Sequence, residues 1–165
     1  MKITADTVKT LREQSGAGVM ECRNVLAEAD GDIVKAVEIL KGRSLYKAEK
    51  KKERATTQGL VEAYIHSGGR IGAMVELSCE TDFVARTNEF KQLAHDLAMQ
   101  IAAMSPKFIT KEEIPAGSDA TANDCLTAQP FIKCADQTIQ DLINQTIAKV
   151  GENIQVKRFA RFEVG

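Results

Sequence analysis

The 165-residue sequence has no excess of charge of either sign, because 22 lysines and arginines are balanced by 23 aspartates and glutamates. The resulting net charge of -1 removes any whole-molecule case for nucleic-acid binding. The sequence also lacks a run approaching the roughly 18 apolar residues that span a bilayer. Its N-terminal residues, MKITADTVKT, have neither the apolar segment of a secretion signal nor the arginine-rich pattern of a transit peptide. We therefore expect a cytoplasmic protein that binds neither nucleic acid nor membrane.

Signatures of catalysis and of metal binding are also missing. The 4 cysteines form no Cys-x-x-Cys pair, and neither of the 2 histidines has a second ligand close in sequence, so a zinc site is not expected. No serine or cysteine stands in a recognisable nucleophile signature, and there is no glycine-rich phosphate loop. We expect no metal, no cofactor, and reduced thiols at Cys22, Cys79, Cys125 and Cys134.

Residues 1–45 show the pattern of three short amphipathic helices that form a small bundle. Thr4 can cap the first helix, and Gly16 can end it in the left-handed conformation. Asp32 places a carboxylate at the start of the third helix, where the helix dipole favours it, and Gly42 is expected to end that helix.

The loop between the first two helices carries apolar residues, GAGVM, where a polar turn would serve. Its two glycines allow close backbone approach, so Val19 and Met20 could project outward as a contact surface. Alternatively, Met20 packs back onto Val8 and Leu11. The residues alone leave both interpretations open.

Residues 46–57 are rich in charge and have no apolar stripe. This pattern is typical of a solvated linker, in part helical. The basic residues could instead touch an acidic surface or RNA, although the pattern favours a tether.

Residues 58–165 are expected to form an α+β module, and the 44% hydrophobic content of the chain supports a real core. Period-two alternation predicts antiparallel strands over 59–66 and 70–79, joined by a glycine turn. Helical stripes predict helices over 88–104 and from Thr138 to Gly151. A last strand shows an apolar row that we expect on one face: Ile154, Val156, Ala160, Phe162 and Val164. The predicted fold is a three-stranded antiparallel sheet packed with helices, preceded by the helical bundle.

The sequence Thr81-Asp82-Phe83-Val84 lies between the second strand and the first helix of this module. A turn that joins two packed elements is a rigid place from which to present a side chain to a partner. The simpler interpretation, which the residues alone favour, is that Thr81 caps a short turn and Phe83 fills the core beneath it.

Three strings together resemble the elongation factor Ts family: LREQSGAGVMECRNVLAEADGDIVKAVEIL, ELSCETDFVARTNEF and KVGENIQVKRFARFEVG. The first is similar to the ubiquitin-associated-like module that opens those proteins, and the second to their signature segment. The chain is most similar to the short form, which has a single core subdomain and no protruding helical insertion. In that form two copies can pair through their cores, although Ala160 excludes a disulfide from that position here.

The resemblance implies guanine-nucleotide exchange on elongation factor Tu, with no covalent chemistry. It places the contacts in two groups: Thr81, Asp82, Phe83 and Val84 in the turn, and Leu11, Val19 and Met20 in the N-terminal module. Phe83 would wedge between helices of the partner's G domain, and Asp82 would help to displace the groups that hold its magnesium ion.

Two rival functions follow from the same residues. The helical bundle could be an adaptor of the ubiquitin-associated type that binds peptides, with the core as a passive partner. The α+β module could instead be a small enzyme that uses Asp82 and His95.

Overall fold

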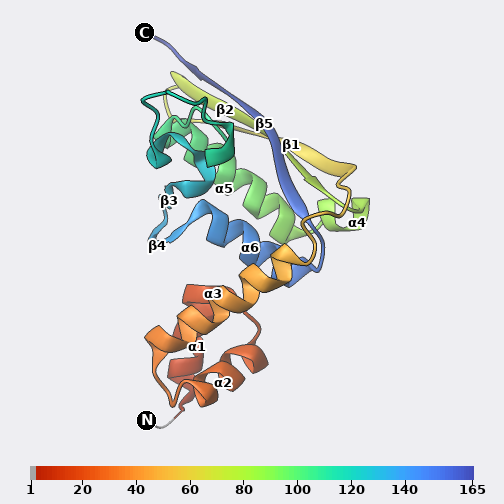
Figure 1. Ribbon diagram of the computed structural model, residues 1–165, viewed down its shortest axis with the longest axis vertical. Coiled ribbons are helices and arrows are strands. Elements are labelled where there is room, and N and C mark those ends of the chain that lie inside the picture. The colour runs from red at the N-terminus through yellow and green to blue at the C-terminus, as the bar shows by residue number, and fades with distance from the viewer. Residues whose placement is uncertain (1–2) are drawn as a thin grey trace.

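The N-terminal residues form a three-helix bundle in the computed structural model, which describes residues 3–165 (Figure 1). The helices are α1 (Ala5–Ser15), α2 (Val19–Glu28) and α3 (Ile33–Glu49). The hydroxyl of Thr4 caps α1, Gly16 ends it with φ 65°, and the Asp32 carboxylate accepts the backbone N–H groups that begin α3. These local predictions are confirmed. The bundle has its own core: Leu11, Cys22, Val25, Leu26, Ala29, Ala36 and Leu40.

Helix α3 does not end at Gly42, as predicted, but continues to Glu49. A glycine inside a helix costs about 1 kcal/mol relative to alanine, and here the packing of the continued helix overrides that cost. The last turns of α3 bury Ala48 in the core of the larger module. The predicted module boundary after residue 45 therefore lies within a helix.

The charged residues after α3 are not a free tether. Residues 50–54 form turns whose side chains are largely exposed, as the composition indicated. Their backbone is fixed, however, because the side-chain amide of Asn153 donates hydrogen bonds to the carbonyl oxygens of Lys52 and Arg54, at 3.2 and 2.8 Å. The helical bundle is thus joined to the larger module by an ordered connection.

The larger module is built on an antiparallel sheet with strand order β1-β2-β5. Its strands are β1 (Gln58–Ile65), β2 (Ile71–Cys79) and β5 (Ile154–Glu163). Helices α5 (Asn88–Met104) and α6 (Ile139–Val150) lie on one side of it (Figure 1), and the predicted α+β fold is confirmed. The capping residues Thr87 and Thr138 begin these helices, and Gly151 ends α6 with φ 80°.

Strand β5 changes faces partway along its length. Leu77 pairs with Val156 and Glu76 pairs with Arg158, so Lys157 has no partner in the ladder and forms a bulge. Before the bulge, Ile154 and Val156 pack into the core; after it, Phe159 does so instead. The expectation of one apolar row along this strand is therefore wrong.

The bulge turns Ala160 and Phe162 onto the face of the sheet that the helices leave uncovered. Ala160 pairs with Met74 and Phe162 with Gly72, and these in turn pair with Ala63 and Ile65. We call this surface the outer face, and its exposed large apolar side chains are Val61, Ile65, Met74 and Phe162. The part of this face nearest the β1–β2 turn is thus apolar but not covered by this chain, whereas Glu76 and Arg158 form an ion pair further along it.

Short elements fill the region between α5 and α6. Three 3-10 turns, Lys111–Glu113, Ala122–Asp124 and Leu126–Ala128, lead into a small hairpin of β3 (Pro130–Phe131) and β4 (Cys134–Thr138). Buried Gln100 orders this region, since its amide nitrogen donates to the carbonyl of Pro130 and its oxygen accepts the N–H of Ile132. Over residues 3–165, no helix is both long and apolar enough to cross a membrane.

All 4 cysteines are free thiols, and Cys134 is the one that is not fully buried. We expect a thiol reagent at neutral pH to label one cysteine per folded chain rapidly and the others after unfolding, because burial blocks access and disfavours the thiolate. Colorimetric thiol titration with and without denaturant measures both amounts. The Cys134→Ser variant should lose the rapid reaction, and a rapid reaction that survives in that variant would contradict the assignment.

Candidate functional site

The turn after β2, residues 81–84, presents an aromatic side chain to solvent. Thr81 is the N-cap of the short helix α4 (Asp82–Ala85), and its hydroxyl accepts the backbone N–H of Val84 at 3.4 Å. Phe83 is 79% exposed. The capping role of Thr81 is confirmed, but the interpretation that Phe83 fills the core is wrong. A large aromatic side chain that is exposed to solvent on a capped turn is typical of a residue that contacts a partner protein.

Asp82, next to that ring, carries a carboxylate with a weak partner. Its Oδ2 lies 2.8 Å from the guanidinium of Arg86, one helical turn away; the Arg86 side chain is largely exposed and that of Asp82 is half-exposed. An exposed pair of this kind is worth about 0–1 kcal/mol. The carboxylate can therefore leave Arg86 for another cation or donor at little cost.

The other two residues of the turn serve as its anchor. Val84 is buried, together with Ala85, in the main hydrophobic core. Thr81 is half-buried, and its backbone carbonyl accepts a hydrogen bond from the Cys79 thiol at 3.1 Å. Burial, assisted by the charge of Glu152, raises the pKa of that thiol to about 11. Cys79 is therefore protonated at neutral pH and acts as a donor, not as a nucleophile.

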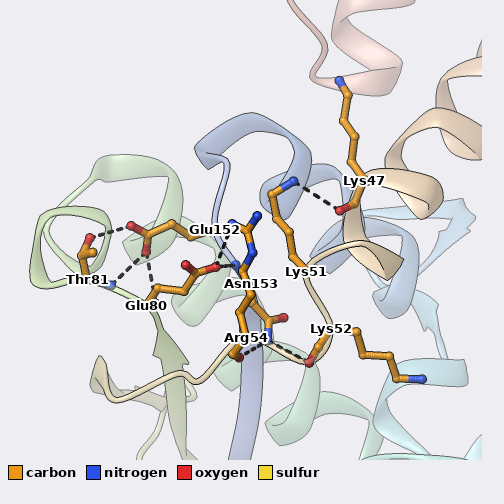
Figure 2. A network of polar contacts seen from close by, with 8 residues as sticks. All are labelled: Lys47, Lys51, Lys52, Arg54, Glu80, Thr81, Glu152 and Asn153. Atoms are coloured by element: carbon orange, nitrogen blue, oxygen red, sulfur yellow. Dashed lines mark hydrogen bonds and ion pairs between the residues drawn. The ribbon is translucent and has the colours of Figure 1, made fainter.

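Two residues that sequence reasoning did not assign to the site hold this turn from behind (Figure 2). The Glu152 carboxylate accepts the backbone N–H groups of Glu80 and Thr81 and the Thr81 hydroxyl. The Glu80 carboxylate accepts the backbone N–H of Asn153 at 2.7 Å. Glu152 lies in the string GENI and Glu80 in the string ELSCETDFV, but nothing local in either string indicated a partner about seventy residues away.

The N-terminal module offers a second exposed apolar surface. Val19 and Met20 begin α2 directly after Gly18, and their side chains are 51% and 62% exposed. The alternative in which Met20 packs back onto Val8 and Leu11 is therefore wrong. Leu11 itself is fully buried in the bundle core, so its predicted place on the contact surface is also wrong. We call the surface formed by Val19 and Met20 the N-terminal patch.

The histidines do not join the 81–84 turn in a catalytic arrangement. His95 lies 3.2 Å from a carboxylate oxygen of Glu62 and edge-on to the ring of Tyr64, whereas Asp82 pairs with Arg86. In the part of the chain that the structure describes, no cluster of histidine, cysteine, aspartate and glutamate side chains is placed to hold a metal ion. The geometry fits a protein-binding surface and gives the predicted Asp82 and His95 pair no support.

Comparison with known proteins identifies the family. The model of the family described as Elongation factor TS matches residues 6–130. The chain belongs to the elongation factor Ts family. It is 46% identical to elongation factor Ts of Carboxydothermus hydrogenoformans, over 99% of this chain and 89% of that protein. It is also 46% identical to elongation factor Ts of Fervidobacterium nodosum over the full length of both chains, and 47% identical to that of Heliobacterium modesticaldum.

Elongation factor Ts is a cytoplasmic nucleotide exchange factor for elongation factor Tu and is not an enzyme. The predicted family, function and protein partner are thereby confirmed, and the adaptor and enzyme alternatives are set aside. The alignment with the Fervidobacterium protein extends over 196 positions, more than the 165 residues of this chain. That protein therefore contains residues that have no counterpart here.

Proposed function

We propose that the 81–84 turn is the part of this exchange factor that enters the G domain of elongation factor Tu and dislodges its magnesium ion, so that GDP leaves and GTP can rebind. The observation that carries this proposal is the exposure of Phe83, 79% of whose surface is open to solvent on a turn anchored to the sheet. Any surface that buries this ring must therefore belong to another molecule.

The energies indicate how the two side chains divide the task. Burying one phenylalanine ring is worth roughly 1.5–3 kcal/mol, whereas a thousandfold acceleration of nucleotide release needs about 4 kcal/mol of barrier lowering. The wedge alone is therefore not enough. Loss of the magnesium charge from the phosphates must contribute the rest, and the weakly paired carboxylate of Asp82 is the group that can act on the cation's surroundings.

The coupling between the two ligands of elongation factor Tu is reciprocal. An exchange factor weakens bound nucleotide by the same factor by which nucleotide weakens the bound exchange factor. High concentrations of GDP or GTP should therefore dissociate the complex. The cycle needs no covalent step and no cofactor.

The direct test of this function is release of labelled GDP from elongation factor Tu. The purified chain should accelerate release in a concentration-dependent and saturable way. An excess of unlabelled GDP should dissociate the complex. A chain that binds elongation factor Tu without accelerating release would contradict the proposal.

The N-terminal patch is proposed as the second contact, which supplies affinity more than rate. Replacing Val19 and Met20 together by serine should raise the concentration needed for half-maximal release about tenfold, because roughly 1.4 kcal/mol of apolar burial is lost from the complex. The maximal rate should stay near that of the parent chain. The matched control is Val34→Ser, since Val34 is also exposed on the helical module, at 71%. An unchanged half-maximal concentration in the double variant would contradict the assignment.

We also propose that two copies of this chain pair through the outer face. Ala63, Met74 and Ala160 lie side by side in adjacent strands, and Ile65 and Phe162 flank Gly72. An antiparallel sheet with helices on one side normally exposes polar residues on the other, and an exposed apolar patch marks an association surface. A second copy presents the same self-complementary surface, as a two-fold interface requires. Since residue 160 is alanine, the association rests on packing and not on a disulfide there.

A further inference from the structure

Two carboxylates exchange backbone hydrogen bonds between distant turns of the larger module. Glu152, just after α6, accepts the N–H of Glu80 at 3.1 Å, the N–H of Thr81 at 3.0 Å and the Thr81 hydroxyl at 2.6 Å. In return, Glu80 accepts the N–H of Asn153 at 2.7 Å. Figure 2 shows these side chains lying between the two turns, with Thr81 at one end. Hydrogen bonds to a carboxylate are the stronger kind in proteins, so this pairing fixes one turn against the other.

The contacts of Glu152 converge on Thr81, the N-cap residue of α4. The Thr81 hydroxyl donates to Glu152 and also accepts the N–H of Val84, so one group links the carboxylate to the helix cap. The backbone N–H of Thr81 is held by Glu152, and its carbonyl is held by the Cys79 thiol. Every polar group of Thr81 therefore has a partner. The backbone that precedes Asp82 and Phe83 is therefore fixed, which restricts the directions in which their side chains project.

The same network reaches the connection to the helical bundle. Asn153 donates its side-chain amide to the carbonyls of Lys52 and Arg54, and the Arg54 guanidinium lies 3.6 Å from the Glu80 carboxylate. Asn153 is buried, so its side-chain amide is shielded from water. The 81–84 turn and the segment that follows the helical bundle are thus held by two adjacent residues, Glu152 and Asn153.

We propose that Glu152 is a positioning residue for nucleotide exchange: its carboxylate holds the cap of α4 so that the Phe83 ring is presented in the orientation that enters elongation factor Tu. This inference rests on the function proposed above for the 81–84 turn. Glu152 does not touch the partner in this account and acts through Thr81.

The physical reason lies in what an unheld turn would do. An exposed aromatic ring on a mobile turn samples many orientations, and those must be lost when it enters the partner, which raises the barrier. A misplacement of about 1 Å can cost a reacting system as much as a hundredfold in rate. When Glu152 holds the cap, the orientations of the ring are already restricted before the two proteins meet, so fewer have to be lost on entry. The effect should therefore appear in the maximal rate and not in the initial docking through the N-terminal patch.

The test is labelled-GDP release from elongation factor Tu with Glu152→Ala and Glu152→Gln. We expect Glu152→Ala to lower the maximal rate about tenfold with little change in the half-maximal concentration. Glu152→Gln should recover most of the rate, because its amide oxygen can accept both backbone N–H groups and its amide nitrogen can donate to a rotated Thr81 hydroxyl. Glu53→Ala, an exposed glutamate on the connecting segment, is the matched control.

A double-mutant cycle with Phe83→Ala separates positioning from general destabilisation. If Glu152 acts through the ring, Glu152→Ala should cost much less in the Phe83→Ala background than in the parent chain. Equal losses in both backgrounds would overturn the inference, as would a Glu152→Ala variant with the parent's maximal rate. If Glu152→Ala does not fold, Glu152→Asp, which keeps the charge but shortens the reach by one methylene, is expected to show the same defect.

The outcomes also separate this inference from the proposed function. A slow Phe83→Ala together with a fast Glu152→Ala would overturn the positioning role and leave the wedge intact. A Phe83→Ala variant that exchanges at the parent rate would overturn both.

Discussion

Replacing Phe83 by alanine should slow the maximal rate of stimulated GDP release from elongation factor Tu roughly 30-fold, the effect of losing about 2 kcal/mol of ring burial in the exchange complex. The fold should be unaffected, because 79% of this side chain is exposed and little packing is lost. Thermal unfolding of the variant should therefore match that of the parent chain. The measurement is single-exponential release of a fluorescent GDP at saturating exchange factor.

The role of the magnesium ion can be separated in the same assay. If Asp82 and Phe83 act by dislodging the ion, a chelator should bring the rates of Phe83→Ala and Asp82→Ala closer to the parent rate, because the step that they accelerate has already taken place. Tyr46→Ala is a matched control, since Tyr46 is another exposed aromatic residue, on α3. Parent-like release by both turn variants without chelator would show that the wedge assignment is wrong.

Replacing Met74 by lysine should convert the expected dimer into a monomer. Met74 sits in the middle strand of the outer face, beside Ala63 and Ala160. A second copy would bury the new ammonium group without a partner, at a cost of about 4 kcal/mol or nearly a thousandfold in the dissociation constant. The monomer itself should remain folded, because 47% of the Met74 side chain is exposed in the single chain.

Size-exclusion chromatography with light scattering checks this prediction directly. The parent chain should elute with twice the chain mass of 18.0 kDa, and Met74→Lys with that mass alone. Val34→Lys places the same charge on exposed helix α3 and should leave the dimer intact. A monomeric parent chain, or a dimeric Met74→Lys, would exclude the outer face as the interface. The variant also shows whether exchange on elongation factor Tu needs the second copy.

Local sequence determined the elements whose signals are local. The caps at Thr4, Asp32 and Thr138 and the left-handed glycines at 16 and 151 began and ended helices as expected. Alternation defined the β1–β2 hairpin, because side chains on a strand must take opposite faces in turn. The resemblance of three strings to elongation factor Ts then supplied the family and its activity, which composition and periodicity could not.

Tertiary structure decided where a local pattern was compatible with more than one outcome. Helix α3 continues past Gly42 because its last turns pack on the larger module. A bulge at Lys157 places Ala160 and Phe162 on the outer face, although their spacing alone fitted a single apolar row. Leu11 and Val19 are both apolar residues of the same module, yet one fills its core and the other faces solvent.

The contacts that hold the 81–84 turn in place were the feature that the sequence predicted least well. Thr81 and Glu152 are 71 residues apart, and no local periodicity reports a bond between them. A helix cap or a strand face depends on neighbours within a few residues, whereas the direction in which Phe83 points depends on contacts that exist after the chain has closed on itself. The residues of the turn could thus be named from the sequence, but their outward presentation required the fold.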